Sequence, residues 1–246
     1  MRVVLPALIV ALLVAGCGAG EPPRADAQPA QAPSAFTAER ERARAAAPKG
    51  RFVAAKIVEP VRMRATPGGR RLERLRRKTE FGSPKIVSVV ARRDGWLRVL
   101  APERPNHRPA WIPARAARVG TVDVSIHVDR SRRMLTVRRA GRVVRRLPVA
   151  VGRPGTPTPL GRFAVTDRLR TGRGDSPYGC CALALSGHQT KLLPGWPGGD
   201  RLAIHATPQP ETIGKAASLG CLRASDRHMR ALMRIVPLGA PVFVRV

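Results

Sequence analysis

Two residues near the C-terminal end of the chain have the types and the spacing that acyl-transfer chemistry requires. His205 lies in an apolar run, and Cys221 follows sixteen residues later, directly after Gly220. A cysteine is nucleophilic as its thiolate, which forms near neutral pH when a base or a cation lies beside it. A glycine before the cysteine permits a sharp turn that exposes the sulfur and leaves N–H groups free to bind an oxyanion. The pattern favours a thiol nucleophile with a histidine base over a structural cysteine.

Mainly β-strands must position this pair. Alternating apolar residues, separated by Gly- and Pro-rich turns, predict strands at 122–128, 134–137, 143–151, 163–166, 181–186, 201–206 and 241–246. A short helix is expected at 211–217. Ser225 is expected to cap a second, amphipathic helix whose apolar residues recur at i, i+3, i+4 and i+7. We therefore predict that residues 119–246 form a mainly antiparallel β-sandwich or barrel with one or two short helices.

A smaller β module is predicted at residues 51–118. Short strands are expected at 52–58, 71–75, 86–91, 96–100 and 111–113, which suggests a small barrel. The Gly95–Val99 and Ala110–Ile112 pieces resemble a bacterial SH3-like module, and this resemblance implies a wall-binding or spacer role. We expect Trp96 and Trp111 to pack in the core, with ligand stacking as the alternative.

The N-terminus predicts export and lipid anchoring. Met1-Arg2 and a short apolar run end at Leu13-Val14-Ala15-Gly16-Cys17. This resembles the lipoprotein signal of bacteria, in which the cysteine receives a diacylglyceryl group. We expect a signal peptide at 1–16, a lipid-anchored disordered tether at 17–50, and a location at the outer face of the cytoplasmic membrane. The alternative is a secretory signal cleaved nearby, with Cys17 incidental.

The charge of the chain is extreme. Its 45 basic and 16 acidic residues give a net charge of +29, and only six of the basic residues are lysine. Such a surface adheres to polyanions, including acidic polymers of the cell wall. The arginines are dispersed and accompany no helix-turn-helix or zinc-finger pattern, so specific nucleic-acid recognition is not expected.

Three motifs together resemble a known enzyme family. They are Thr158-Pro159-Leu160-Gly161-Arg162-Phe163, Ile204-His205-Ala206 and Ser218-Leu219-Gly220-Cys221-Leu222-Arg223. At this spacing they are similar to the L,D-transpeptidases of the YkuD type, and the resemblance covers about residues 120 to 246. It implies a YkuD-like β domain that acts on peptidoglycan stem peptides without a cofactor.

The resemblance also implies roles for single residues. Cys221 corresponds to the nucleophile and His205 to the base. The carbonyl of Ala206 orients the histidine ring, and the N–H groups of Gly220 and Cys221 form the oxyanion hole. Arg223 is expected to fix the turn or bind a substrate carboxylate.

Two further residues are expected to border the substrate. Ser218 hydrogen-bonds within the turn or contacts substrate, and Tyr178 corresponds to an aromatic residue in a flap over the site. Many family members have His where this chain has Leu219, which cannot make a hydrogen bond. His205 is therefore expected to be the sole base near the nucleophile.

The adjacent Cys180 and Cys181 are not explained by this chemistry. Neighbouring cysteines rarely bridge each other, so pairing with a partner or burial is expected, with Cys180 flanking the active-site cleft. A zinc site that uses them with His205 and Cys221 lacks paired C-x-x-C spacing, and we expect no metal.

The expected reaction is 3→3 cross-linking of stem peptides through a cysteine thioester. One alternative keeps the site and transfers the acyl group to water, as an L,D-carboxypeptidase does, or to a protein amine. A second alternative is a non-catalytic wall-binding lipoprotein, and a third is a polyanion binder.

Overall fold

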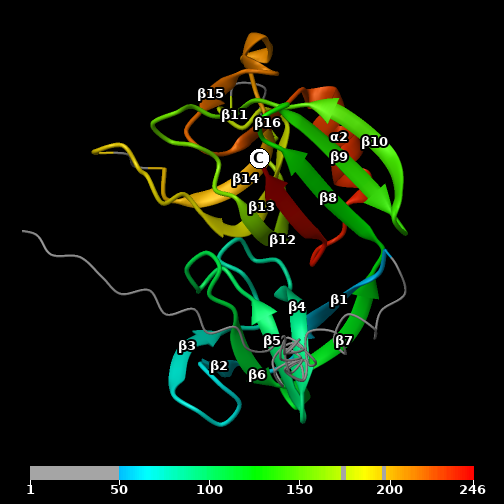
Figure 1. Ribbon diagram of the computed structural model, residues 1–246, viewed down its shortest axis with the longest axis vertical. Helices are drawn as coiled ribbons and strands as arrows, with labels where there is room; N and C mark the ends of the chain where they lie inside the picture. Colours follow the sequence, from blue (N-terminus) through cyan, green and yellow to red (C-terminus); the bar gives the residue numbers. More distant parts are fainter. Residues whose placement is uncertain (1–49, 173–175, 196–197) are drawn as a thin grey trace, which may run out of the picture.

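The computed structural model describes residues 50–172, 176–195 and 198–246. The predicted signal peptide, the lipidation site Cys17 and the tether up to residue 49 lie outside the described residues. The described part is mainly β, as predicted, and its two large sheets lie end to end along the long axis of the molecule (Figure 1). No helix within these ranges is long and apolar enough to cross a membrane.

The first module is a seven-stranded sheet with the order β3-β2-β6-β5-β4-β1-β7. Its core is lined by buried side chains that alternate with outward ones, as in β5, where Leu97 and Val99 are buried and Arg98 between them is partly exposed. Trp111 is buried at 8% exposure, with the Arg98 guanidinium 5.9 Å from its ring centroid, whereas Trp96 is partly exposed, so the expected burial holds for Trp111 alone. The strands are β1 (Phe52–Ile57), β2 (Val61–Arg64), β3 (Arg71–Leu75), β4 (Ile86–Arg93), β5 (Trp96–Leu100), β6 (Ala110–Pro113) and β7 (Ala117–Val122).

The first sheet extends past the predicted boundary at residue 118. β7 runs to Val122 and pairs with the whole of β1, from Phe52↔Val122 to Ile57↔Ala117. The sequence prediction missed β7 because its Arg, Gly and Thr residues hide the alternation, and the strand is stabilised by pairing rather than by burial.

The second module is an eight-stranded sheet with the order β10-β9-β8-β17-β12-β13-β14-β16. It is mixed rather than antiparallel throughout, because β17 pairs with β8 and β14 pairs with β16 in parallel. A separate parallel pair joins β11 to β15. The strands are β8 (Val124–Asp129), β9 (Met134–Arg139), β10 (Arg142–Pro148), β11 (Val151–Gly152), β12 (Gly161–Arg170), β13 (Cys181–His188), β14 (Arg201–Ala206), β15 (Ala216–Ser218), β16 (Leu222–Ala224) and β17 (Pro241–Arg245).

One α-helix, α2 (Asp226–Ile235), packs against β13 and β14. Ser225 caps it by accepting a hydrogen bond from the His228 N–H, and Met229 and Leu232 enter the core, as the sequence predicts. The helix expected at 211–217 is instead a short 3₁₀ turn, η2 (Pro210–Thr212), followed by Gly214 at φ +81°. That left-handed conformation ends any helical turn.

A polar seam joins the two modules. The buried Thr79 hydroxyl donates to the buried Asp167 carboxylate at 2.5 Å, and Arg162 Nη2 donates to Ser88 Oγ at 3.1 Å. Asn106 makes a reciprocal pair with the backbone of His188, at 2.7 and 2.9 Å. The seam therefore fixes the end of β13, directly before Gln189, to the first module.

Candidate active site

The pairing of β14 with its neighbours brings His205 and Cys221 onto one face of the sheet. His205 lies opposite Ala182 of β13 and opposite Arg223 of β16. Paired residues point to the same face, and residues two apart along a strand do so as well. Cys221 lies in the bend directly before β16, and its Sγ lies 3.9 Å from the Arg201 carbonyl of β14, while Leu222 is buried in the core on the other face. The nucleophile, the base and the arginine predicted from the sequence are therefore neighbours.

His205 is held as a neutral ring with a defined tautomer. It is 4% exposed, and its Nδ1–H donates to the Ala206 carbonyl at 2.5 Å, as the resemblance implies. Burial lowers the pKa of His205 to about 4; the Ala206 carbonyl opposes this and the nearby Arg223 charge adds to it. At neutral pH the ring is uncharged, and Nε2 carries the lone pair that can accept a proton.

Cys221 is held as a thiol in this structure. Its Sγ lies 3.9 Å from the Arg201 carbonyl, to which the thiol donates. Burial raises the pKa of Cys221, while the backbone at Ala203 and the charge of Arg223 lower it less strongly. With the pKa of His205 lowered and that of Cys221 raised, the imidazole and the thiol are both uncharged at neutral pH, so His205 would form the thiolate by taking the thiol proton. This arrangement suits proton transfer to His205 during nucleophilic attack.

The turn before the nucleophile is tied together by Ser218. Its hydroxyl donates to the Cys221 carbonyl at 2.6 Å and accepts from the Gly220 N–H at 3.1 Å, and the side chain is buried. Of the two roles expected for Ser218, the structure shows the one within the turn. The Gly220 N–H, expected in the oxyanion hole, is engaged by Ser218, whereas the Cys221 N–H has no hydrogen-bond partner among the described residues.

Gln189 is a positioning residue that the sequence analysis missed. Its buried side-chain amide donates to the Leu219 carbonyl at 2.8 Å and to the Pro157 and Thr156 carbonyls at 3.2 and 3.3 Å. It therefore joins the proline-rich loop to the cysteine turn. Gly220 has φ +122°, and a Cβ there would lie 2.1 Å from Gln189 Nε2, so glycine is required at this position.

Tyr178 and Arg223 border the histidine from two sides. The ring of Tyr178 meets the ring of His205 edge to face, with centroids 5.1 Å apart. Arg223 Nη1 donates to Gln209 Oε1 at 3.3 Å, which directs the guanidinium along the surface beside His205. Tyr178 is exposed and Arg223 is partly exposed, so both have surface that is open to a substrate.

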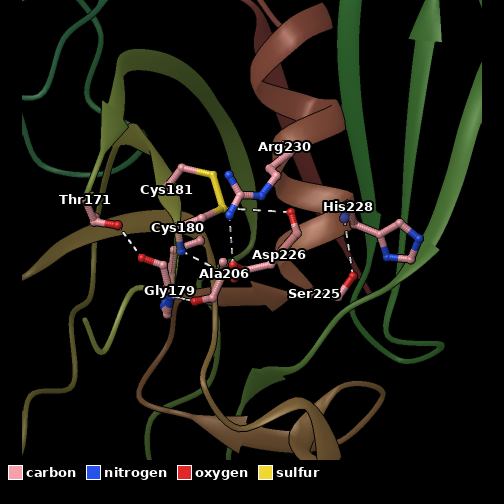
Figure 2. The surroundings of a disulfide bond; sticks show 10 residues. Thr171, Gly179, Cys180, Cys181, Ala206, Ser225, Asp226, His228 and Arg230 are labelled. Atoms are coloured by element: carbon pink, nitrogen blue, oxygen red, sulfur yellow. Dashed lines mark hydrogen bonds and ion pairs between the residues drawn. A yellow bond between two sulfur atoms is a disulfide. The ribbon is translucent and has the colours of Figure 1, made fainter. Parts of the chain in front are cut away.

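Cys180 and Cys181 form a disulfide with each other, contrary to the expectation that neighbouring cysteines would not bridge (Figure 2). A contact with α2 also holds Cys180 in place, since the Cys180 N–H donates to Asp226 Oδ1 at 3.3 Å. Cys221 is the free cysteine of the described residues, which contain no cluster of three or more residues able to hold a metal ion.

Comparisons with known proteins place this site in a family. The model of the L,D-transpeptidase catalytic domain, YkuD, matches residues 123–244. YkuD of Bacillus subtilis (strain 168), which is named as an L,D-transpeptidase, is 34% identical over 124 residues, which cover 50% of this chain and 67% of YkuD.

Solved structures also match. An L,D-transpeptidase from Mycobacterium tuberculosis H37Rv is 22% identical with a TM-score of 0.42, over 55% of this chain and 64% of that one. The catalytic domain of an L,D-transpeptidase from E. faecium is 27% identical with a TM-score of 0.36, over 50% of this chain and 97% of that one. The chain thus spans somewhat less than two thirds of the M. tuberculosis protein.

Proposed function

Because the chain belongs to the family of L,D-transpeptidase catalytic domains, we propose that it transfers acyl groups between peptidoglycan stem peptides through a thioester on Cys221. One observation carries the proposal. A buried histidine has its Nδ1–H fixed by the carbonyl of Ala206, and a cysteine in a glycine turn contacts the strand that carries this histidine. This is the nucleophile, base and orienter arrangement that acyl transfer uses on other folds.

In the first half-reaction, the thiol attacks the carbonyl of the third residue of a tetrapeptide donor. The thiol proton passes to Nε2 of His205, whose ring is neutral at physiological pH. The carbonyl oxygen of the donor becomes an oxyanion, and the Cys221 N–H donates a hydrogen bond to it. His205 then gives its proton to the departing D-Ala amine, and the thioester remains.

In the second half-reaction, an amine of a neighbouring stem attacks the thioester, and His205 takes the proton of the amine. The bond between the acyl carbon and Cys221 Sγ breaks, and the proton returns to the sulfur. The product is a 3→3 cross-link. We propose that Arg223 binds a carboxylate of one of the two stems, because its Nη1 reaches the surface beside His205. Tyr178 would cover the other side of the reacting carbonyl, since its ring contacts His205.

We also propose that the chain acts outside the cytoplasmic membrane, anchored through lipid on Cys17. The support is the sequence Leu13-Val14-Ala15-Gly16-Cys17 after a short apolar run. The first module would serve as an SH3-like spacer or wall-binding unit, and its arginine-rich surface would favour acidic wall polymers.

Intact-mass spectrometry with a carbapenem tests the nucleophile. The full chain is expected to gain the mass of one carbapenem, and the Cys221→Ala variant to gain none. If the wild type never forms the adduct, a non-catalytic wall-binding role becomes the better explanation.

Digestion of cell walls from cells with and without the protein tests the acceptor. The transpeptidase proposal expects 3→3 dimers that depend on Cys221. If tetrapeptide stems are instead shortened to tripeptides and no new dimers form, then water is the acceptor and the protein is a carboxypeptidase.

A further inference from the structure

A basic cavity lies on the face of the second sheet that is turned away from the catalytic residues. Ala182 pairs with His205, so the adjacent Cys181 points to the opposite face, where α2 packs. The cavity there has a volume of about 690 Å³. Its wall includes both cysteines of the disulfide and four arginines from two elements: Arg168 and Arg170 of β12, and Arg230 and Arg234 of α2.

These arginines give the cavity a strong positive charge. Arg230 lies 3.5 Å from the Asp226 carboxylate, but Arg168, Arg170 and Arg234 make no ion pair with any described residue. No acidic residue is among the described residues that line the cavity. Guanidinium groups retain their charge at any physiological pH, so the cavity attracts small anions throughout that range.

The two sulfur atoms differ in their access to this cavity. Cys181 is 4% exposed and packs in the core, whereas Cys180 is partly exposed. A molecule in the cavity therefore reaches Cys180 Sγ first. Cys181 in turn lies directly opposite Arg170 in the pairing of β12 with β13. A neighbouring guanidinium stabilises a thiolate, so Cys181 is a suitable leaving group when the disulfide is attacked.

We propose that the Cys180–Cys181 disulfide is a reduction site for small anionic thiols, which the arginine-lined cavity recruits. The thiolate of the incoming molecule attacks Cys180 Sγ and forms a mixed disulfide. The bond between Cys180 and Cys181 breaks, and its electron pair goes to Cys181 Sγ opposite Arg170. A second molecule of the thiol attacks the mixed disulfide, leaves as the symmetric disulfide of the reductant, and releases Cys180 as a thiol. Two thiols are oxidised and one protein disulfide is reduced.

The disulfide is connected to the catalytic face through a very short segment. Tyr178, whose ring contacts His205, precedes Cys180 by two residues. Gly179 between them is tightly packed, since a Cβ there would lie 2.6 Å from Ala206 Cβ and 2.7 Å from Asp226 Oδ1. Figure 2 shows Gly179 and Cys180 to one side of α2, with Asp226 of the helix beside Cys180. Opening the ring frees the Cys180 backbone to rotate, and the position of Tyr178 over His205 changes with it.

Reduction kinetics test the recruitment step, and this test does not depend on the proposed function. The oxidised full chain, in a Cys221→Ala background, is treated with 3-mercaptopropionate, 2-mercaptoethanol or cysteamine, at equal thiolate concentration. The reaction is quenched by alkylation, and peptide mapping follows Cys180 and Cys181. We expect the anionic thiol to react about tenfold faster than the cationic one, in keeping with electrostatic steering.

Two charge-matched variants separate the cavity from the general basic surface. Arg170→Gln with Arg230→Gln should reduce the preference for the anionic thiol to about twofold or less. Arg142→Gln with Arg146→Gln, on the exposed strand β10, should leave it unchanged. Equal rates for the three thiols, equal losses in both variants, or alkylation of both cysteines before any reductant is added would each overturn the proposal.

Tyr178 gives an independent measure of the connection to the active site. It is the single tyrosine of the chain, so tyrosine isotopically labelled at Cζ alone yields one NMR signal. Reduction should shift this signal, because the ring of Tyr178 leaves the edge of the His205 ring. A signal that stays in place after complete reduction would refute the coupling of the disulfide to the flap.

Discussion

The depressed pKa of His205 predicts how the stability of the protein depends on pH. The ring has a pKa of about 4 in the folded chain, against 6.5 ordinarily, mainly because burial disfavours its charge. Between these two values the unfolded chain binds a proton and the folded chain does not. The contribution of His205 is therefore fully present above about pH 6.5 and is lost as the pH falls toward 4.

The size of this effect follows from the two pKa values. At about 1.4 kcal/mol for each tenfold change in proton affinity, the gap between 6.5 and about 4 corresponds to about 3 kcal/mol of unfolding free energy. Most of the loss falls between pH 6 and pH 4.5. Below pH 4 the folded state also binds the proton, and the contribution of this residue becomes constant.

Urea unfolding of the wild type and of His205→Asn, between pH 4 and pH 8, measures the effect. Asparagine keeps a side-chain N–H near the Ala206 carbonyl but does not titrate. All other groups are shared, so the difference in unfolding free energy between the two proteins isolates His205. That difference should change by about 3 kcal/mol across the range, with the wild type losing more stability in acid.

A matched control is His228→Asn. Burial also lowers the pKa of His228, but this side chain is less buried than His205, so a smaller change is expected. Parallel stability curves for the wild type and His205→Asn would refute the reasoning. They would mean that His205 titrates normally and is not held neutral by its surroundings.

Three further predictions concern the elements that hold the site. Gln189→Ala should slow carbapenem acylation of Cys221 by about tenfold, because it removes the contact with the Leu219 carbonyl in the turn and the two contacts with the proline-rich loop. Rapid-quench mass analysis would detect this, and an unchanged rate would argue against positioning. Gly220→Ala should destabilise the chain by about 1–3 kcal/mol in urea unfolding, since it combines a positive φ with a clash; wild-type stability would contradict this. Ser225→Ala should cost about 1 kcal/mol through the loss of a helix cap, and Ser225→Asp should restore it; equal losses in both variants would exclude capping as the cause.

The sequence predicted the strands that alternate clearly and missed those that depend on distant partners. The strand expected at 201–206 is confirmed as β14, because its apolar residues alternate and are buried. β16 was missed: its three residues pair with β14 in parallel, and a strand this short carries no periodicity of its own. The helix expected at 211–217 was wrong because Gly214 takes up a left-handed conformation.

The sequence predicted candidate catalytic residues, but it did not predict the residue that positions the cysteine turn. Cys221 and His205 could be identified because their types and spacing resemble one family. Gln189 could not, since its partners are three backbone carbonyls from two distant segments, and a carbonyl has no sequence signature. The sequence also does not predict the raised pKa of Cys221, because this shift depends on how deeply the folded chain buries the sulfur.

The segment that matches relatives is shorter than the part of this chain that the polar seam joins into one structure. The family model begins at residue 123, yet Asp167 and His188 have their partners in Thr79 and Asn106. A fragment cut at the family boundary would leave a buried carboxylate without its donor and would release the end of β13 next to Gln189. The catalytic domain of this chain, cut at that boundary, would therefore have a less tightly held nucleophile turn. For this chain, the first module should be retained in any truncated form whose kinetics are to be compared.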